Sequence, residues 1–215
     1  MTDGHLPEVA AVLFDFGGVL APSPFDAFSR YEQENGLAPG FIRSINAANH
    51  HDNAWAYLER NEIDFDTFCD AFEAEATAAG GLVDARALFA MITGTIRPQM
   101  VEAVRRCRRR FKTGLLTNNF ISPTTGEFSG RAMGDVLDLF DAVVASSEVG
   151  IRKPDPRFYE LACHVLGIEP QDAVFLDDLG VNLKPARAMG MVTIKVEDPD
   201  VALGRLEEVL GIPLR

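Results

Sequence analysis

The sequence predicts an α/β fold built on a parallel sheet, and three observations support this. Short apolar runs, mostly β-branched or aromatic, recur along the chain, as expected for strands that are buried on both faces. Helical patterns lie between these runs, and such alternation is typical of parallel sheets with right-handed crossovers. One long stretch after the first run contains helical patterns only. The runs that we expect to be strands are Ala10–Phe16, Thr113–Thr117, Ala142–Ala145, Ala173–Leu176 and Met191–Val196.

Two helices between the expected strands have clear patterns. Pro98–Phe111 begins with a proline, which suits the first turn of a helix because no backbone N–H is needed there. Asp155–Leu166 carries its apolar side chains on one face, which is the pattern of a helix packed against a sheet.

The stretch from about Pro22 to Thr95 contains no convincing strand. Because it follows the first strand directly, we expect it to lie over the carboxyl edge of the sheet as a lid on Asp15. The sequence therefore predicts a core domain of residues 1–21 and 96–215 and a helical cap domain of residues 22–95. The helices expected in the cap are Phe25–Asn35, Phe41–Asn49, Asn53–Arg60 and Asp66–Ala79.

The composition and net charge of the chain argue against some classes of binding partner. The 215 residues carry a formal net charge of -12, which argues against non-specific binding to nucleic acid or to anionic membranes. The three cysteines are far apart and lack CxxC spacing, which indicates reduced thiols in a cytoplasmic protein. We expect no signal peptide, and no apolar run approaches the about 18 residues that span a membrane. The sequence carries no signal for a particular oligomeric state.

Acidic residues follow two of the expected strands. Asp15 ends the first apolar run, and Asp177 and Asp178 end the fourth. Open α/β sheets bind ligands at the carboxyl ends of their strands, so these acids are expected at the binding edge. Two consecutive acids at a strand end are unfavourable unless a cation neutralises them. Oxygen ligands without His or Cys favour magnesium over zinc.

Polar residues that suit phosphate follow two other strands. Thr117 and Asn118 offer a hydroxyl and an amide, which are donors to phosphate oxygens. Lys153 lies in a loop before a helix and offers a fixed cation. Each signal alone is weak, since turns and helix caps use the same residue types. Their shared position at strand ends makes a common site the better interpretation.

These segments together resemble the haloacid dehalogenase-like hydrolase superfamily over about residues 10–210. Residues 14–19 are similar to its first motif, Thr117 and Asn118 to the second, Lys153 to the third, and residues 177–178 to the fourth. Within the superfamily, residues 116–119, 153–156 and 175–187 look most like the amino-terminal phosphatase domain of soluble epoxide hydrolases. The related domain that precedes some acyl-CoA dehydrogenases shares the glycine pair that follows Asp15. We expect no second catalytic domain after residue 215.

The resemblance implies a Rossmann-like three-layer core with an inserted helical cap, and a phosphatase mechanism. Asp15 would attack phosphorus to form an aspartyl-phosphate, which water then hydrolyses. Thr117 and Asn118 would bind the phosphoryl oxygens, and Lys153 would bind substrate and balance charge during catalysis. The expected substrate is a small phosphate ester.

The resemblance also implies a magnesium site. Asp15, the Gly17 carbonyl and Asp178 would bind Mg²⁺, and Asp177 would support this site or act as a further ligand. Most phosphatases of this superfamily have a second acid at the position of Gly17. That acid protonates the leaving oxygen, and a general acid typically contributes about 10²–10⁴-fold. Catalysis is therefore expected to be weakened.

Three interpretations of function remain open. The first is a magnesium-dependent phosphatase of reduced or specialised activity. Water or a cap residue could replace the missing acid; His50 and His51 are candidates, with a plain surface location as the alternative. Arg152 is expected on the surface, although it could join Lys153. The second is a non-catalytic phosphate- and metal-binding pseudophosphatase. The third is a 2-haloacid dehalogenase, in which Asp15 attacks carbon without a metal.

Overall fold

The computed structural model describes residues 9–92, 95–119 and 134–215. Within them, a five-stranded parallel sheet has the order β3-β2-β1-β4-β5. This confirms the expected α/β fold class. The strands are β1 Ala11–Phe14, β2 Lys112–Thr117, β3 Ala142–Ala145, β4 Ala173–Asp177 and β5 Val192–Lys195.

Strand β1 lies at the centre of the sheet, and all four of its residues are buried. Phe14 is in register with Leu115 of β2 and Leu176 of β4. Alternate residues of β1 pack on opposite faces: Val12 and Phe14 join one apolar cluster, whereas Ala11 and Leu13 join another. Burial on both faces explains why the strand sequences are continuously apolar.

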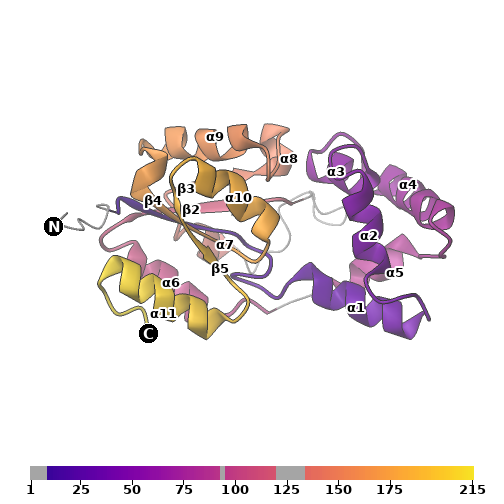
Figure 1. Ribbon diagram of the computed structural model, residues 1–215, viewed down its shortest axis with the longest axis horizontal. Helices are drawn as coiled ribbons and strands as arrows, with labels where there is room; N and C mark the ends of the chain where they lie inside the picture. Colours follow the sequence, from indigo (N-terminus) through magenta and orange to yellow (C-terminus); the bar gives the residue numbers. More distant parts are fainter. Residues whose placement is uncertain (1–8, 93–94, 120–133) are drawn as a thin grey trace.

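Helices cover both faces of the sheet and make a three-layer core (Figure 1). Helices α9 and α10 lie on one face, and α6 and α11 on the other. Short helices follow β2 and β3 along the chain. The helices of this part are α6 Pro98–Cys107, α7 Gly134–Leu137, α8 Ser146–Val149, α9 Pro156–Leu166, the 3₁₀ helix η2 Pro170–Asp172, α10 Gly180–Ala188 and α11 Pro199–Leu210.

The segment between β1 and α6 folds into helices that lie together beyond the carboxyl edge of the sheet (Figure 1). They enclose an apolar cluster of their own, in which the Trp55 ring contacts Phe28, Phe68, Phe72 and Phe89. The helices are α1 Pro24–Glu34, α2 Phe41–Ala48, α3 Ala54–Glu59, α4 Phe65–Ala78 and α5 Ala85–Met91. The numerical domain boundaries stay a prediction.

The observed elements differ from the expected ones in a few places. Strand β1 ends at Phe14, before the expected Phe16, because the chain turns at the glycines that follow. Helix α6 ends at Cys107, and a turn connects it to β2. Helix α5 was not expected; its N-cap Asp84, which accepts a hydrogen bond from the Ala87 N–H, was the available signal.

Two expectations from composition can be compared with the structure. The three cysteines, Cys69, Cys107 and Cys163, are buried and form no disulfide. Among the described residues, no helix combines the length and the apolar character needed to cross a bilayer.

Candidate active site

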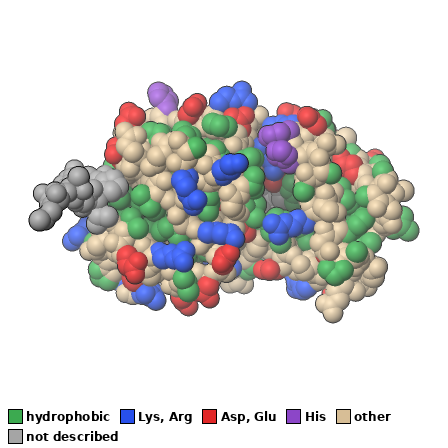
Figure 2. All heavy atoms as spheres, viewed as in Figure 1, with side chains coloured by type: hydrophobic (Ala, Val, Ile, Leu, Met, Phe, Trp, Pro, Cys, Tyr) green, Lys and Arg blue, Asp and Glu red, His purple; other side chains and the backbone are tan. Residues whose placement is uncertain are grey.

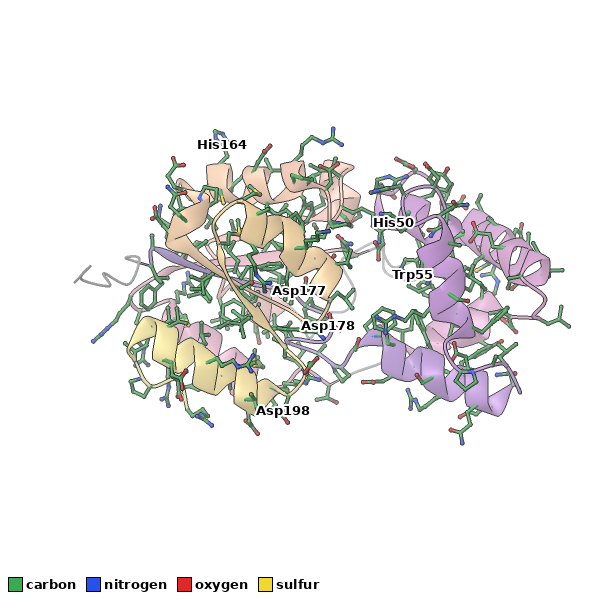
Figure 3. All side chains as sticks on the ribbon, in the orientation of Figure 1. His50, Trp55, His164, Asp177, Asp178 and Asp198 are labelled. Atoms are coloured by element: carbon green, nitrogen blue, oxygen red, sulfur yellow. The ribbon has the colours of Figure 1, made fainter. Side chains whose placement is uncertain are left out.

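The carboxyl edge of β1 and β4 brings the expected acids together. Asp15 directly follows β1, and its N–H donates to the Leu176 carbonyl at 2.9 Å. Asp177 is the last residue of β4, and Asp178 follows it. Asp177 and Asp178 lie at the sheet edge that faces helices α1–α5, with His50 and Trp55 on the other side (Figure 3). The side chains of these three acids each offer an oxygen within 4.8 Å of the others.

Lys153 joins two of these acids. Its Nζ lies 2.8 Å from Asp15 Oδ1 and 2.8 Å from Asp177 Oδ2. The lysine is 1% exposed although it belongs to the loop between α8 and α9. Asp15 Oδ1 also accepts the Phe16 N–H at 2.6 Å, so two donors fix the orientation of this carboxylate. An expected nucleophile and an expected cation therefore touch in a buried site.

The charges of the cluster are not balanced by the protein. Burial raises the pKa of Asp15 well above its usual range, although Lys153 opposes this shift and Asp177 adds to it. Burial and Asp177 raise the pKa of Asp178 to about 6. Burial works against the charge of Lys153, but Asp15 and Asp177 raise its pKa. Three carboxylates and one ammonium leave an excess of negative charge, which a divalent cation would neutralise.

Asp177 is fully buried, and protein donors occupy its oxygens. Besides Lys153, it accepts the Leu179 N–H at 2.8 Å and the Asn182 side-chain amide at 3.1 Å from each oxygen. Asn182 is itself held, because Tyr159 Oη donates to its carbonyl at 2.7 Å. This arrangement favours a supporting role for Asp177, the first of the two roles expected for it.

Asp178 lies against the glycine turn that follows Asp15. Ser23 Oγ donates to Asp178 Oδ2 at 2.9 Å. Gly18 has a φ of 77°, and a Cβ added there would lie 2.3 Å from Asp178 Cγ and Oδ2. Gly18 is therefore needed for its backbone conformation and for the space that Asp178 occupies. The all-oxygen donor set of Asp15 and Asp178 fits Mg²⁺, which prefers carboxylate and carbonyl ligands.

Replacement of Gly18 by Ala is expected to remove Mg²⁺ binding, because the new Cβ would displace the Asp178 carboxylate. The left-handed φ would add strain of about 1–2 kcal/mol. The measurement is the thermal shift induced by MgCl₂. Gly17→Ala is the matched control, because Gly17 lies outside the left-handed region and its added Cβ would meet Pro24 Cδ at 3.3 Å, a tight contact. An equal Mg²⁺-induced shift in the Gly18 variant and the wild type would contradict this account.

Thr117 and Asn118 lie beside the cluster at the end of β2. Thr117 is 3% exposed. The Asn118 side chain donates to the Lys153 carbonyl at 3.0 Å and accepts the Lys153 N–H at 2.8 Å. Its amide therefore holds the backbone of Lys153, a role that the sequence did not suggest. The expected contacts of Thr117 and Asn118 with phosphoryl oxygens stay predictions.

Gly17 provides no proton donor, and its backbone does not require a glycine. His50 and His51 are exposed, with ring centroids 4.0 Å apart. Figure 2 shows histidine side chains at the edge of a furrow between the core and helices α1–α5. Burial, His51 and Arg152 lower the pKa of His50. The pair is thus on the surface, but at the cap–core boundary.

Arg152 is not a surface residue, contrary to expectation. Its side chain is 17% exposed and its Nε lies 2.6 Å from Glu59 Oε2 of helix α3. Sequence reasoning also missed Glu59, Ser23 and Asn182. Glu59 and Ser23 have no local signature, because their roles depend on contacts between distant segments. Asn182 offered a weak signal as an amide five residues after Asp177.

Comparison with known proteins shows the family to which the chain belongs. The sequence profile of the haloacid dehalogenase-like hydrolases matches residues 9–190. Acyl-CoA dehydrogenase family member 10 of Mus musculus is 35% identical over 210 residues, and bifunctional epoxide hydrolase 2 of Sus scrofa is 33% identical over 217 residues; each match covers 95% of this chain. The chain spans only 19% and 39% of the lengths of these two proteins. Sesquiterpene phosphatase astK of Aspergillus oryzae is 28% identical over 159 residues, covering 73% of this chain and 79% of that protein.

Solved structures share the fold at lower identity. The HAD family enzyme bt-2542 of Bacteroides thetaiotaomicron, crystallised with magnesium and inorganic phosphate, matches with a TM-score of 0.59 and 21% identity over 87% of this chain and 93% of that one. L-2-haloacid dehalogenase of Xanthobacter autotrophicus, with chloropropionic acid covalently bound, matches with a TM-score of 0.59 and 20% identity over 93% of this chain and 82% of that one. From the family profile and the relatives above 30% identity, the chain belongs to the haloacid dehalogenase-like hydrolases.

Proposed function

We propose that this chain is a magnesium-dependent phosphatase that acts on a small phosphate ester through an aspartyl-phosphate on Asp15. The observation that carries the proposal is the buried cluster in which Lys153 Nζ lies 2.8 Å from both Asp15 and Asp177, with Asp178 alongside. We favour the phosphatase over a metal-independent dehalogenase because three carboxylates beside one ammonium suit a divalent cation. Similarity to a sesquiterpene phosphatase supports phosphate ester chemistry.

Asp15 is the proposed nucleophile. Its carboxylate oxygen forms a bond to phosphorus while the bond from phosphorus to the leaving oxygen breaks, and water then cleaves the acyl phosphate. Lys153 favours the ionised form of Asp15, orients its carboxylate, and balances charge on the phosphoryl group. Thr117 and Asn118 are the proposed donors to the phosphoryl oxygens. Asp177 holds Lys153 in place.

The residues that would hold Mg²⁺ are Asp15, Asp178 and the Gly17 carbonyl, with Asp177 in support. A bound Mg²⁺ ion supplies positive charge that lets an anionic phosphate approach a carboxylate. The excess negative charge that the three carboxylates bring to the cluster supports this assignment. Ser23 keeps Asp178 turned toward the glycine turn.

We also propose that residues 22–95 act as a cap over a core made of residues 1–21 and 96–215. The separate apolar cluster of α1–α5 supports this division. A cytoplasmic setting stays a prediction.

A panel of phosphate esters with and without Mg²⁺ tests the proposed activity. We expect Mg²⁺-dependent phosphate release that is fastest for aryl esters, whose leaving groups have a low pKa and need little protonation. Chelation of Mg²⁺ should stop the reaction. Turnover that is unaffected by chelation, or no turnover across the panel, would contradict the proposal.

Gly17 favours one alternative, a pseudophosphatase that binds Mg²⁺ and phosphate without turnover. It predicts that Mg²⁺ and inorganic phosphate raise the melting temperature while no ester is hydrolysed. Metal-independent release of halide from 2-haloacids would instead identify a dehalogenase.

A further inference from the structure

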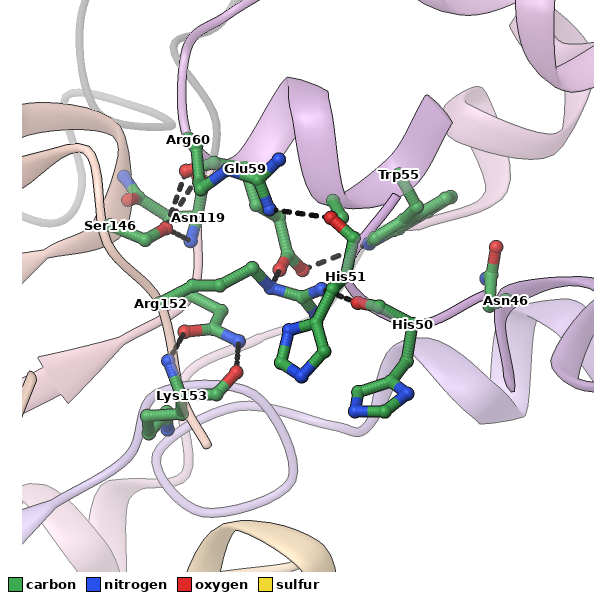
Figure 4. A network of polar contacts seen from close by, with 12 residues as sticks. Asn46, His50, His51, Trp55, Glu59, Arg60, Asn119, Ser146, Arg152 and Lys153 are labelled. Carbon is green, nitrogen blue, oxygen red and sulfur yellow. Dashed lines mark hydrogen bonds and ion pairs between the residues drawn. The ribbon is translucent and has the colours of Figure 1, made fainter. Parts of the chain in front are cut away.

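A buried ion pair connects the cap helices to the core. Arg152 Nε of the core lies 2.6 Å from Glu59 Oε2 at the end of helix α3, and the two side chains are 17% and 11% exposed (Figure 4). The two atoms are close without the alignment of a hydrogen bond, so their attraction is mainly Coulombic.

Two hydrogen bonds reinforce this contact. Arg152 Nη1 donates to the His50 carbonyl at 2.7 Å. Ser146 Oγ, at the start of α8, donates to the Glu59 carbonyl at 2.6 Å and accepts the Asn119 N–H at 3.0 Å. The end of α3 and the turn before it are thus tied to the core by contacts from two core residues, Arg152 and Ser146.

The core side of this contact belongs to the same backbone segments as the candidate active site. Arg152 directly precedes Lys153, and Asn119 directly follows Asn118. The Asn118 side chain makes two hydrogen bonds to the Lys153 backbone. The position of α3 is therefore tied to the segments that carry the site lysine.

The Arg152–Glu59 ion pair favours the arrangement in which the cap packs on the core over arrangements in which the two are partly separated. When the parts are together, loss of either partner leaves an uncompensated buried charge, which is strongly unfavourable. When the cap and the core are apart, water solvates both Arg152 and Glu59. Buried ion pairs contribute little net stability to a fold. Their better-attested effect is to specify one alignment of the elements that pack together. Arg152 lies in the core and Glu59 in the cap, so this pair is placed to specify how the cap packs on the core.

The single tryptophan of the chain lies at this contact. Trp55 Nε1 donates to Glu59 Oε1 at 2.9 Å, and its ring packs among the cap phenylalanines. Its fluorescence therefore reports on the environment of Glu59 without any label.

We propose that Arg152 and Glu59 are positioning residues that latch helix α3 over the Lys153 segment and set the fraction of molecules in which the cap is closed. The proposal concerns cap closure at the same site. Its kinetic part rests on the proposed phosphatase function, whereas its fluorescence part does not. If substrate is bound in the closed state, a smaller closed fraction raises KM by the same factor and leaves kcat unchanged.

Acrylamide quenching of Trp55 fluorescence tests the latch. We expect Arg152→Ala and Glu59→Gln each to raise the quenching constant at least about 2-fold, because water and quencher reach an opened contact. The Gln side chain keeps an oxygen for the Trp55 N–H, so its effect isolates the charge. The double variant should match the single variants, since the two residues act as one unit. Arg152→Lys, which keeps the cation, should restore part of the protection.

Arg60→Ala is the matched control. Arg60 follows α3 directly, but the contacts of its guanidinium with Glu62 and the His51 carbonyl lie within the cap. The Arg60→Ala variant should leave the quenching constant of Trp55 fluorescence unchanged. Wild-type quenching in both Arg152→Ala and Glu59→Gln would overturn the latch, whatever the turnover. With an active wild type, a fall in kcat at unchanged KM would overturn it too. Absence of wild-type turnover would count against the proposed function only.

Discussion

Replacement of Asp15 by Asn is expected to abolish phosphate release, with a loss on the order of 10³-fold or more, because an amide does not form the acyl phosphate. The substitution keeps the size of the side chain. It also removes a buried carboxylate whose pKa burial raises, so the protein should remain folded. The measurement is the rate of phosphate release from an aryl phosphate at saturating Mg²⁺, together with the melting temperature.

Asp70→Asn is the control, because Asp70 is an exposed residue of helix α4, outside the cluster. It should keep wild-type rates. Retention of more than a tenth of wild-type turnover in a folded Asp15→Asn variant would show that another group attacks phosphorus.

Replacement of Gly17 by Asp is expected to raise turnover of alkyl phosphates by about 10²–10⁴-fold, the usual contribution of a general acid. Alkyl esters have leaving groups with a high pKa and need protonation most. The backbone of Gly17 accepts a side chain, although the new Cβ must fit 3.3 Å from Pro24 Cδ. The measurement is kcat/KM for paired alkyl and aryl phosphates in the variant and the wild type.

Gly17→Asn separates proton transfer from packing, since Asn fills the same space without an acidic proton. It should give no gain on alkyl esters. If the Asp and Asn variants are equally active on alkyl esters, Gly17 is not the missing acid position. If the wild type is inactive and Gly17→Asp creates turnover, the chain is a pseudophosphatase whose residues for binding metal and phosphate are intact.

Much of the fold could be predicted because buried parallel strands have a continuous apolar pattern. Each observed strand overlaps an expected apolar run. A helix was missed where its sequence was too short to show a periodic pattern. Helix α5 has seven residues, too few for a periodicity to emerge. Strand β1 ended early because its last apolar residue, Phe16, belongs to the turn.

The cluster could be anticipated because Asp15 directly follows β1, Asp177 ends β4, and Lys153 lies in the connection after β3, and the carboxyl ends of parallel strands meet at one edge. Contacts between distant segments were not predictable in this way. Nothing local in the sequence indicates that Asn118 holds the Lys153 backbone, or that Arg152 turns to Glu59. The glycine pair indicated a turn, but not that Asp178 fills the space beside Gly18.

Chemical trapping of the intermediate tests the role of Asp15 most directly. Borohydride reduces an acyl phosphate to an alcohol, which would convert a phosphorylated Asp15 into homoserine. After reaction with an aryl phosphate and Mg²⁺, rapid quenching and reduction, peptide mass spectrometry should find homoserine at position 15, and only when Mg²⁺ was present. Turnover with an unmodified Asp15, or with the modification at another residue, would contradict nucleophilic catalysis by Asp15.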